Sequence, residues 1–206
     1  MTHTHQDTQS DRRARATLRW RTVDIIVAAV LGVSFGIVFF AWNNLWASTT
    51  WMFAAFPPAQ AILYGMWFLP GVLSGLVIRK PGAAVFASTV AATVSVFFGA
   101  PGPLQIILYG FGQGLLAEVV FAACRYRRWS LSIALLAGAV AGIGPGILDP
   151  IQWYPTWSST FKAAWLVLVV VSGVLVAGLG SWLLVRALRP TGVLAPFASG
   201  QERTDR

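Results

Sequence analysis

Six long apolar segments, separated by short connections, dominate this 206-residue sequence. Each segment is 17 to 26 residues long, and at about 1.5 Å per residue such a helix reaches or nearly reaches across the ~30 Å core of a bilayer. Backbone groups in lipid must be hydrogen-bonded within their own segment, which favours helices over single strands. The sequence therefore predicts an all-α membrane bundle, with six helices at Val23–Ala41, Ala61–Ile78, Gly82–Phe98, Leu104–Cys124, Leu131–Leu148 and Ala163–Leu188.

The composition agrees with a membrane location. Hydrophobic residues make up 56% of the chain and charged residues only 11%, whereas soluble domains carry about a quarter charged residues. We expect a multi-pass protein of the cell (plasma) membrane in contact with the lipid bilayer. Its parts are a basic tail (1–21), a membrane domain (22–190) and a second tail (191–206).

The basic residues predict the orientation of the bundle. With the N-terminus placed in the cytoplasm, fourteen of the fifteen Lys and Arg residues fall on the cytoplasmic side and only Lys162 falls outside. Cytoplasmic loops carry such an excess of positive charge. Both termini are therefore predicted inside (N-in/C-in), and the net charge of +8 reflects membrane orientation, with no nucleic-acid partner.

Polar and aromatic side chains gather in the outer half. Gln105, Tyr109 and Gln113 recur at a spacing of four and form a stripe along the fourth helix. Polar residues inside a span face the bundle interior or a cavity, so the stripe fits either an outward-opening ligand pocket or hydrogen bonds between helices. Seven of the ten Trp residues also lie in the outer half, more than a symmetric interfacial belt predicts.

Small residues line one face of the first helix, at Ala28, Gly32 and Gly36. This spacing lets a second helix approach closely. The face could dock a partner membrane protein or pack inside the bundle.

Three acidic residues lie in or at the ends of the spans. Glu118, inside the fourth helix, is expected to pair with a cytoplasmic-side arginine or to face a partner, since a charge there costs about 2.5–3.5 kcal/mol. Asp24 is expected to form a local ion pair with Arg19 or Arg21. Asp149 could bind a cationic ligand or hold the turn before the proline that follows it.

The sequence holds no set of catalytic or metal-binding residues. The two histidines lie in the N-terminal tail at His3 and His5, and Cys124 is the single cysteine. No phosphate-binding glycine loop ending in Lys-Ser or Lys-Thr is present. We therefore expect no enzyme activity, no metal and no cofactor.

Several short blocks resemble the YkoE family of S components of energy-coupling factor (ECF) transporters. The similarity extends from about Arg21 to Phe197. The blocks are Trp67-Phe68, Ile78-Arg79-Lys80-Pro81-Gly82-Ala83-Ala84, Gly112-Gln113-Gly114 with Ala117-Glu118, Arg125-Tyr126-Arg127 and Thr191-Gly192-Val193-Leu194.

The resemblance implies a substrate-binding protein of six helices with an outward-facing pocket for thiamine or its hydroxymethylpyrimidine precursor. It also implies docking, through the small residues of the first helix, onto a membrane coupling subunit driven by two ATPases. Where the family pattern has glutamates in the third helix, this chain has Ser88 and Ser95, which leaves room for a neutral or differently substituted pyrimidine. The candidate substrate-binding residues are Trp42, Asn43, Tyr64, Trp67, Ser88, Gln105, Tyr109, Gln113, Asp149 and Trp153.

Two other functions remain open from the residues alone. An autonomous small-molecule carrier would move substrate without partners. An intramembrane enzyme would need facing acid, His or Ser clusters, for which Glu118 is the only buried acid available.

Overall fold

The structure is a computed structural model that describes residues 18–100 and 102–201. The predictions for His3, His5, most of the first tail (1–17) and the end of the second tail (202–206) fall outside these residues. All regular structure in the described ranges is helical. The helices are α2 (Thr22–Thr49), η1 (Thr50–Phe53), η2 (Pro57–Leu63), α3 (Gly65–Ile78), α4 (Ala83–Phe97), α5 (Pro103–Ala123), α6 (Leu131–Gln152), α7 (Ser159–Ser172), η3 (Gly173–Leu179), α8 (Gly180–Leu188), η4 (Arg189–Thr191) and α9 (Ala198–Gln201).

The long helices group into six apolar segments. The 3-10 helix η2 leads into α3, and α7, the π-helical η3 and α8 form one continuous helix. Five segments are long and apolar enough to cross a bilayer. The sixth, α4, has 15 residues and is about 22 Å long. The predicted all-α fold with six helices is confirmed, and five of these helices are long candidate spans.

The predicted ends of two helices are wrong. α2 continues to Thr49 instead of ending at Ala41, because its polar side chains bond to the helix itself. Asn44 Nδ2 donates to the carbonyl of Phe40 at 2.7 Å. α6 continues to Gln152 because a proline in the last turn removes only one amide donor and the helical bonds resume beyond it.

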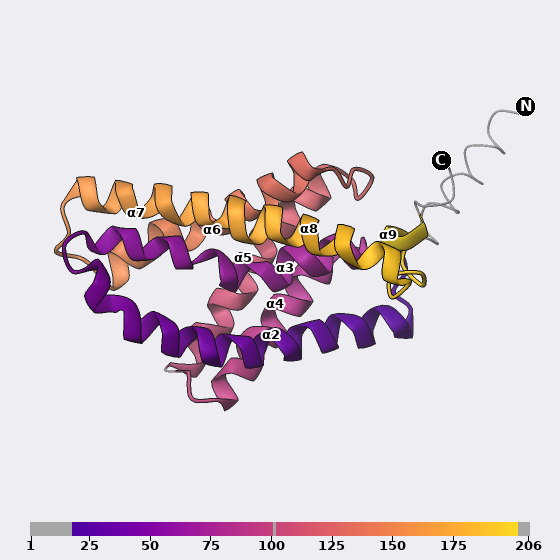
Figure 1. The fold of residues 1–206 in the computed structure, drawn as a ribbon, viewed down its shortest axis with the longest axis horizontal. Coiled ribbons are helices and arrows are strands. Elements are labelled where there is room, and N and C mark those ends of the chain that lie inside the picture. Colours follow the sequence, from indigo (N-terminus) through magenta and orange to yellow (C-terminus); the bar gives the residue numbers. More distant parts are fainter. Residues whose placement is uncertain (1–17, 101, 202–206) are drawn as a thin grey trace, which may run out of the picture.

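α3 lies at the centre of the bundle and contacts α2, α4, α5, α6, η3 and α8. Nearly all of its residues are buried. In Figure 1, α2 and the continuous α7–η3–α8 helix run along opposite sides of the molecule, with α3 between them. We call the end with η1, η2 and the α6–α7 connection the aromatic end, and the end with the α3–α4 and α5–α6 connections the basic end.

The small residues of α2 pack against α4. Ala28, Gly32 and Gly36 are all buried. A Cβ added to Gly32 would lie 2.7 Å from Val90 Cβ, and one added to Gly36 would lie 2.5 Å from Val94 Cβ. The expected docking face is therefore occupied by the protein's own helix, and the internal-packing alternative describes it.

Asp24 organises the start of α2 at the basic end. Its carboxylate is buried, pairs with Lys80, and accepts from the backbone amide of Arg21 at 2.6 Å. The Arg21 guanidinium lies 3.5 Å away, which confirms the expected local ion pair. Arg19 instead contributes its carbonyl, which accepts from Lys80 Nζ at 2.8 Å.

Glu118 holds the N-terminus of α4, and the expected arginine partner is wrong. Its two carboxylate oxygens accept from the backbone amides of Gly82 at 2.8 Å and Ala84 at 2.9 Å. The hydroxyl of Tyr126 donates to Glu118 at 2.7 Å. A helix N-terminus presents unpaired N–H groups and a partial positive charge, so it takes the place of a cation.

Candidate ligand-binding site

A pocket of about 260 Å³ lies near the aromatic end, between α2, α3, α4, α5 and the end of α6. Its lining residues are Phe39, Asn43, Tyr64, Trp67, Ala92, Ser95, Gly102, Gln105, Ile106, Tyr109, Gly110, Gln113 and Trp153. Seven of the ten candidate substrate-binding residues are among them. All three residues of the polar stripe on α5 line the pocket, and Tyr109 and Gln113 also bond to neighbouring helices, so the stripe combines the two predicted uses.

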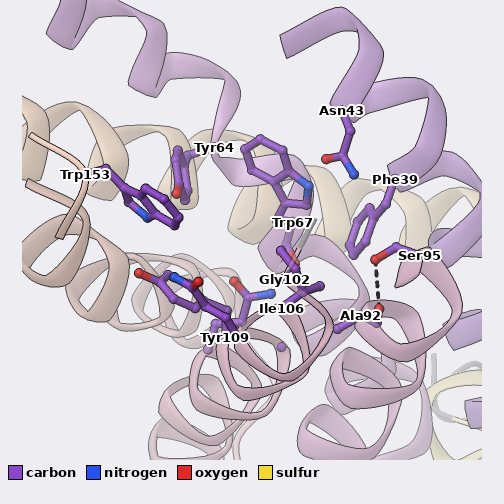
Figure 2. Close-up of a pocket in the computed structure, with 13 residues that line it drawn as sticks. Phe39, Asn43, Tyr64, Trp67, Ala92, Ser95, Gly102, Ile106, Tyr109 and Trp153 are labelled. Carbon is purple, nitrogen blue, oxygen red and sulfur yellow. Dashed lines mark hydrogen bonds between the residues drawn. The ribbon is translucent and has the colours of Figure 1, made fainter. Parts of the chain in front are cut away.

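Aromatic rings form much of the wall. Figure 2 shows Tyr64, Trp67 and Trp153 on one side of the pocket and Tyr109 facing them, while Asn43 lies beyond Trp67. The rings of Tyr64 and Trp67 pack edge to face with centroids 4.9 Å apart. Edge-to-face packing fixes ring orientations, so the wall is held in place before any ligand arrives.

The two glutamine side chains of α5 differ in their hydrogen-bond partners. Gln113 Nε2 donates to the carbonyl of Trp67 at 3.1 Å, which ties α5 to α3 beneath the pocket. Gln105 Nε2 is buried and makes no well-formed hydrogen bond within the described residues, although it lies close enough to Tyr109 to interact with its hydroxyl. Buried polar groups are nearly always hydrogen-bonded, so the unpaired Gln105 nitrogen marks a place where a ligand acceptor would fit.

Asp149 lies behind the pocket wall, not in it. It is 1% exposed, and it accepts from the hydroxyls of Tyr64 and Tyr109, the latter at 2.8 Å. Both alternatives for Asp149, a direct ligand contact and a simple turn-holding role, are therefore replaced by a bridge between two pocket tyrosines. Burial and the nearby Asp149 carboxylate raise the pKa of Tyr154, in the connection after α6, above its ordinary value.

Two other candidate residues lie outside the pocket. Trp42 Nε1 donates to the carbonyl of Leu63 at 3.0 Å and so joins α2 to η2. Ser88 is buried one helical turn from Ala92, and its Oγ lies 2.5 Å from the point where a Cβ on Gly71 would sit. Ser88 is thus enclosed between α3 and α4 below the cavity.

Sequence reasoning missed several lining residues that have no polar pattern. Ile106 and Gly110 lie next to the polar stripe on α5, and widening that stripe by one position would have found them. Phe39 follows Gly36 on the α2 face that packs on α4. Ser95 entered the sequence analysis only as the residue that stands in place of a family glutamate. Its Oγ donates to the carbonyl of Ala92 at 2.8 Å (Figure 2).

The seven outer Trp residues divide into three groups. Trp67 and Trp153 line the pocket. Trp46, Trp157 and Trp165 pack in an aromatic cluster around Tyr64 and Tyr154. Trp42 bonds to η2 and Trp51 is 75% exposed.

The fold and site define a membrane-embedded ligand-binding component, and no group of three metal-ligating side chains occurs in the described residues. The family described as the permease component of an ABC-type cobalt transport system matches residues 23–144. YkoE of Bacillus subtilis (strain 168), named as a candidate HMP/thiamine permease protein, is 34% identical over 184 residues, which is 89% of this chain and 92% of YkoE. The crystal structure of an S component of an ECF transporter is similar with a TM-score of 0.83 and 34% identity, covering 89% of this chain and 93% of that one.

These findings establish the family. The chain belongs to the YkoE-type S components of ECF transporters. It is a multi-span membrane protein of a non-enzymatic family, and as an S component it works with an ECF module.

Proposed function

We propose that this S component captures hydroxymethylpyrimidine or thiamine in the pocket at the aromatic end. The pocket itself carries the proposal, because it combines flat aromatic walls with a few convergent amide and hydroxyl groups, as small-molecule sites do. At about 260 Å³ it falls just below the roughly 300–1,000 Å³ of typical ligand sites. That size suits a single ring, so we expect hydroxymethylpyrimidine to bind more tightly than two-ringed thiamine.

Each part of the pocket has a role in this proposal. Trp67 and Trp153 stack on the flat ring, and a cationic ring gains about 0.5–2 kcal/mol from each aromatic face. Gln105 and Asn43 bond to ring nitrogens and substituents. The substrates in the name of the Bacillus subtilis relative have this chemistry.

We further propose that the aromatic end faces the outside of the cell and the basic end faces the cytoplasm. In the described residues the basic end carries Lys80, Arg125, Arg127 and Arg128, and the aromatic end carries Lys162, which is the asymmetry of an N-in/C-in protein. A Cys124→Ala background allows a test with a membrane-impermeant maleimide. Trp51→Cys should be labelled in intact cells and Arg127→Cys only after lysis; the opposite pattern would reverse the orientation.

The proposed partners are a membrane coupling subunit and two ATPases. Family membership supports them, whereas the buried face of Ala28, Gly32 and Gly36 does not, because α4 covers it. Docking through these residues would require α2 to separate from α4.

Titration followed by Trp fluorescence tests the substrate. Purified protein should change its emission on addition of hydroxymethylpyrimidine, and less strongly on addition of the thiazole fragment. Trp67→Phe should lose much of the signal, whereas Trp51→Phe, at an exposed position, is the matched control. No response to any of these compounds, with no heat in calorimetry, would overturn the assignment; uptake by the chain alone in liposomes would identify a carrier.

A further inference from the structure

We infer that Asp149 selects the ligand through Tyr64 and Tyr109, by accepting both hydroxyl protons and leaving the two tyrosines only acceptor capacity toward the pocket. The inference rests on the proposed function, since it concerns how the same pocket chooses its ligand. Its consequence is a preference for rings that carry N–H donors, such as an exocyclic amino group or a protonated ring nitrogen.

The geometry places Asp149 one layer behind the ligand. The side chain is 1% exposed and is absent from the pocket lining, whereas Tyr64 and Tyr109 both line it. Tyr64 donates to Oδ2 and Tyr109 donates to Oδ1. The Tyr109 hydroxyl also lies 3.2 Å from Gln152 Oε1, a second acceptor. The Asp149 side chain is therefore linked to the pocket lining through the hydroxyls of Tyr64 and Tyr109.

The number of donors and acceptors on a tyrosine hydroxyl determines what the Tyr64 and Tyr109 oxygens can offer to a ligand. A tyrosine hydroxyl has one proton and two acceptor lone pairs. Bonds to a carboxylate are charge-assisted and stronger than neutral ones, so the protons of Tyr64 and Tyr109 stay on the Asp149 side. Within the pocket, Trp153 and Gln105 are the side chains that can donate to the Tyr109 oxygen, and a ligand that meets either tyrosine oxygen must likewise supply the proton itself.

The charge of Asp149 also favours a ligand with an N–H donor. Where both partners are described residues, the ion pairs join Asp24 to Arg21 and Lys80, and the Asp149 carboxylate accepts from the hydroxyls of Tyr64 and Tyr109. A buried carboxylate without a cation is costly. A ligand N–H carrying partial or full positive charge against the tyrosine oxygens offsets part of that cost.

Gln105 supplies a hydrogen-bond donor beside the acceptor oxygen of Tyr109. Its unpaired Nε2 lies on the same face of α5 as Tyr109, four residues away, a spacing that places side chains side by side. The pocket thus offers a donor beside an acceptor. An aminopyrimidine presents the matching pair, a ring nitrogen acceptor next to an amino donor, whereas its oxo analogue presents the reverse order.

Calorimetry with this pair of rings tests the inference. Wild-type protein should bind the 4-aminopyrimidine more tightly than the 4-oxo analogue. In Asp149→Asn the side-chain amide donates to one tyrosine and turns that hydroxyl proton away, so affinity for the amino ring should fall by about tenfold or more and the preference should collapse. In a Tyr64→Phe/Tyr109→Phe background, Asp149→Asn should cause no further change in preference.

The outcomes separate the inference from the proposed function. Wild-type protein that binds neither ring overturns both. Binding of both rings with equal affinity, or a preference that survives Asp149→Asn, overturns the inference alone, as does a further loss of preference in the double-Phe background. If Asp149→Asn fails to fold, Tyr109→Phe is the substitute variant; it keeps the packing and should also weaken the amino preference, and an unchanged preference contradicts the inference.

Discussion

The two ends of the bundle differ in the partners of their buried carboxylates. At the basic end, Asp24 pairs with Lys80 and Arg21, and Glu118 accepts from two backbone amides and Tyr126. At the aromatic end, the carboxylate of Asp149 meets only tyrosine hydroxyls, and Gln105 Nε2 makes no well-formed hydrogen bond in the described structure.

This difference separates a structural role from a binding role. Buried charges at the basic end are satisfied within the chain, so they stabilise the α2–α4 and α4–α5 contacts. At the aromatic end, Gln105, Tyr64 and Tyr109 line a cavity and keep hydrogen-bonding capacity for a ligand. Substitutions at the basic end should therefore change stability without changing affinity, and those at the aromatic end should do the reverse.

The largest effect is expected for Lys80→Met at the basic end. This change leaves the buried Asp24 carboxylate without its closest cation. Breaking a buried pair costs at most about 3–5 kcal/mol, and the remaining contacts with Arg21 offset part of that cost. The melting temperature in detergent should fall strongly, while the folded fraction keeps wild-type affinity for hydroxymethylpyrimidine. Arg128→Gln, an exposed charge on the same side, is the control. A weakened affinity in folded Lys80→Met protein would erase the contrast between the two ends.

Glu118→Gln should have the next largest effect. One carboxylate oxygen becomes an amide nitrogen that cannot accept from the N-terminus of α4, and a buried unsatisfied group costs about 1–3 kcal/mol. Amide hydrogen exchange should speed up at Gly82 and Ala84 more than in α6. Uniform exchange along the chain would show that Glu118 does not hold α4. Tyr126→Phe, which removes one bond only, should cost less.

Gly32→Leu tests the contact between α2 and α4. The side chain would meet Val90 at once, and overpacking costs about 1–3 kcal/mol. We expect a lower melting temperature before any partner is added. Ile26→Leu, on the exposed face of the same helix, should be neutral. Unchanged melting with lost binding to the coupling subunit would restore the docking role of this face.

Gln105→Ala should produce the smallest change and the most specific one. It removes an amide whose buried Nε2 is unpaired in the described structure, so the free energy of unfolding should stay within about 0.5 kcal/mol of wild type or rise slightly. Affinity for the aminopyrimidine should fall about fivefold, as expected for one lost hydrogen bond. Equal losses of stability and affinity would place Gln105 among the structural residues.

Much of the fold could be predicted from the sequence because apolar length is a local property. The six helices followed from their runs of apolar residues, and the ends of α3 and α5 were predicted to within a few residues. The errors at α2 and α6 arose where polar residues or a proline suggested the end of a helix, whereas the helix continues through them. The length of α4 depends on where Glu118, on another helix, holds its N-terminus.

The candidate site was predictable where a pattern repeats within one helix. Gln105, Tyr109 and Gln113 share a face of α5, and all three line the pocket. Whether a residue lines the pocket or lies behind its wall depends on residues that are distant in the sequence. The Asp149 side chain reaches the pocket through Tyr64 and Tyr109, which lie 85 and 40 positions away in the chain. Gly32 is enclosed by α4. Neither contact can be predicted from local spacing.

The most direct test of the account is a structure of the protein bound to hydroxymethylpyrimidine. We expect the ring to stack on Trp67 and Trp153, with its amino group against the hydroxyl oxygens of Tyr64 and Tyr109 and a ring nitrogen within hydrogen-bond distance of Gln105 Nε2. A ring bound elsewhere, or bound here with its amino group turned away from Tyr64 and Tyr109, would contradict the account.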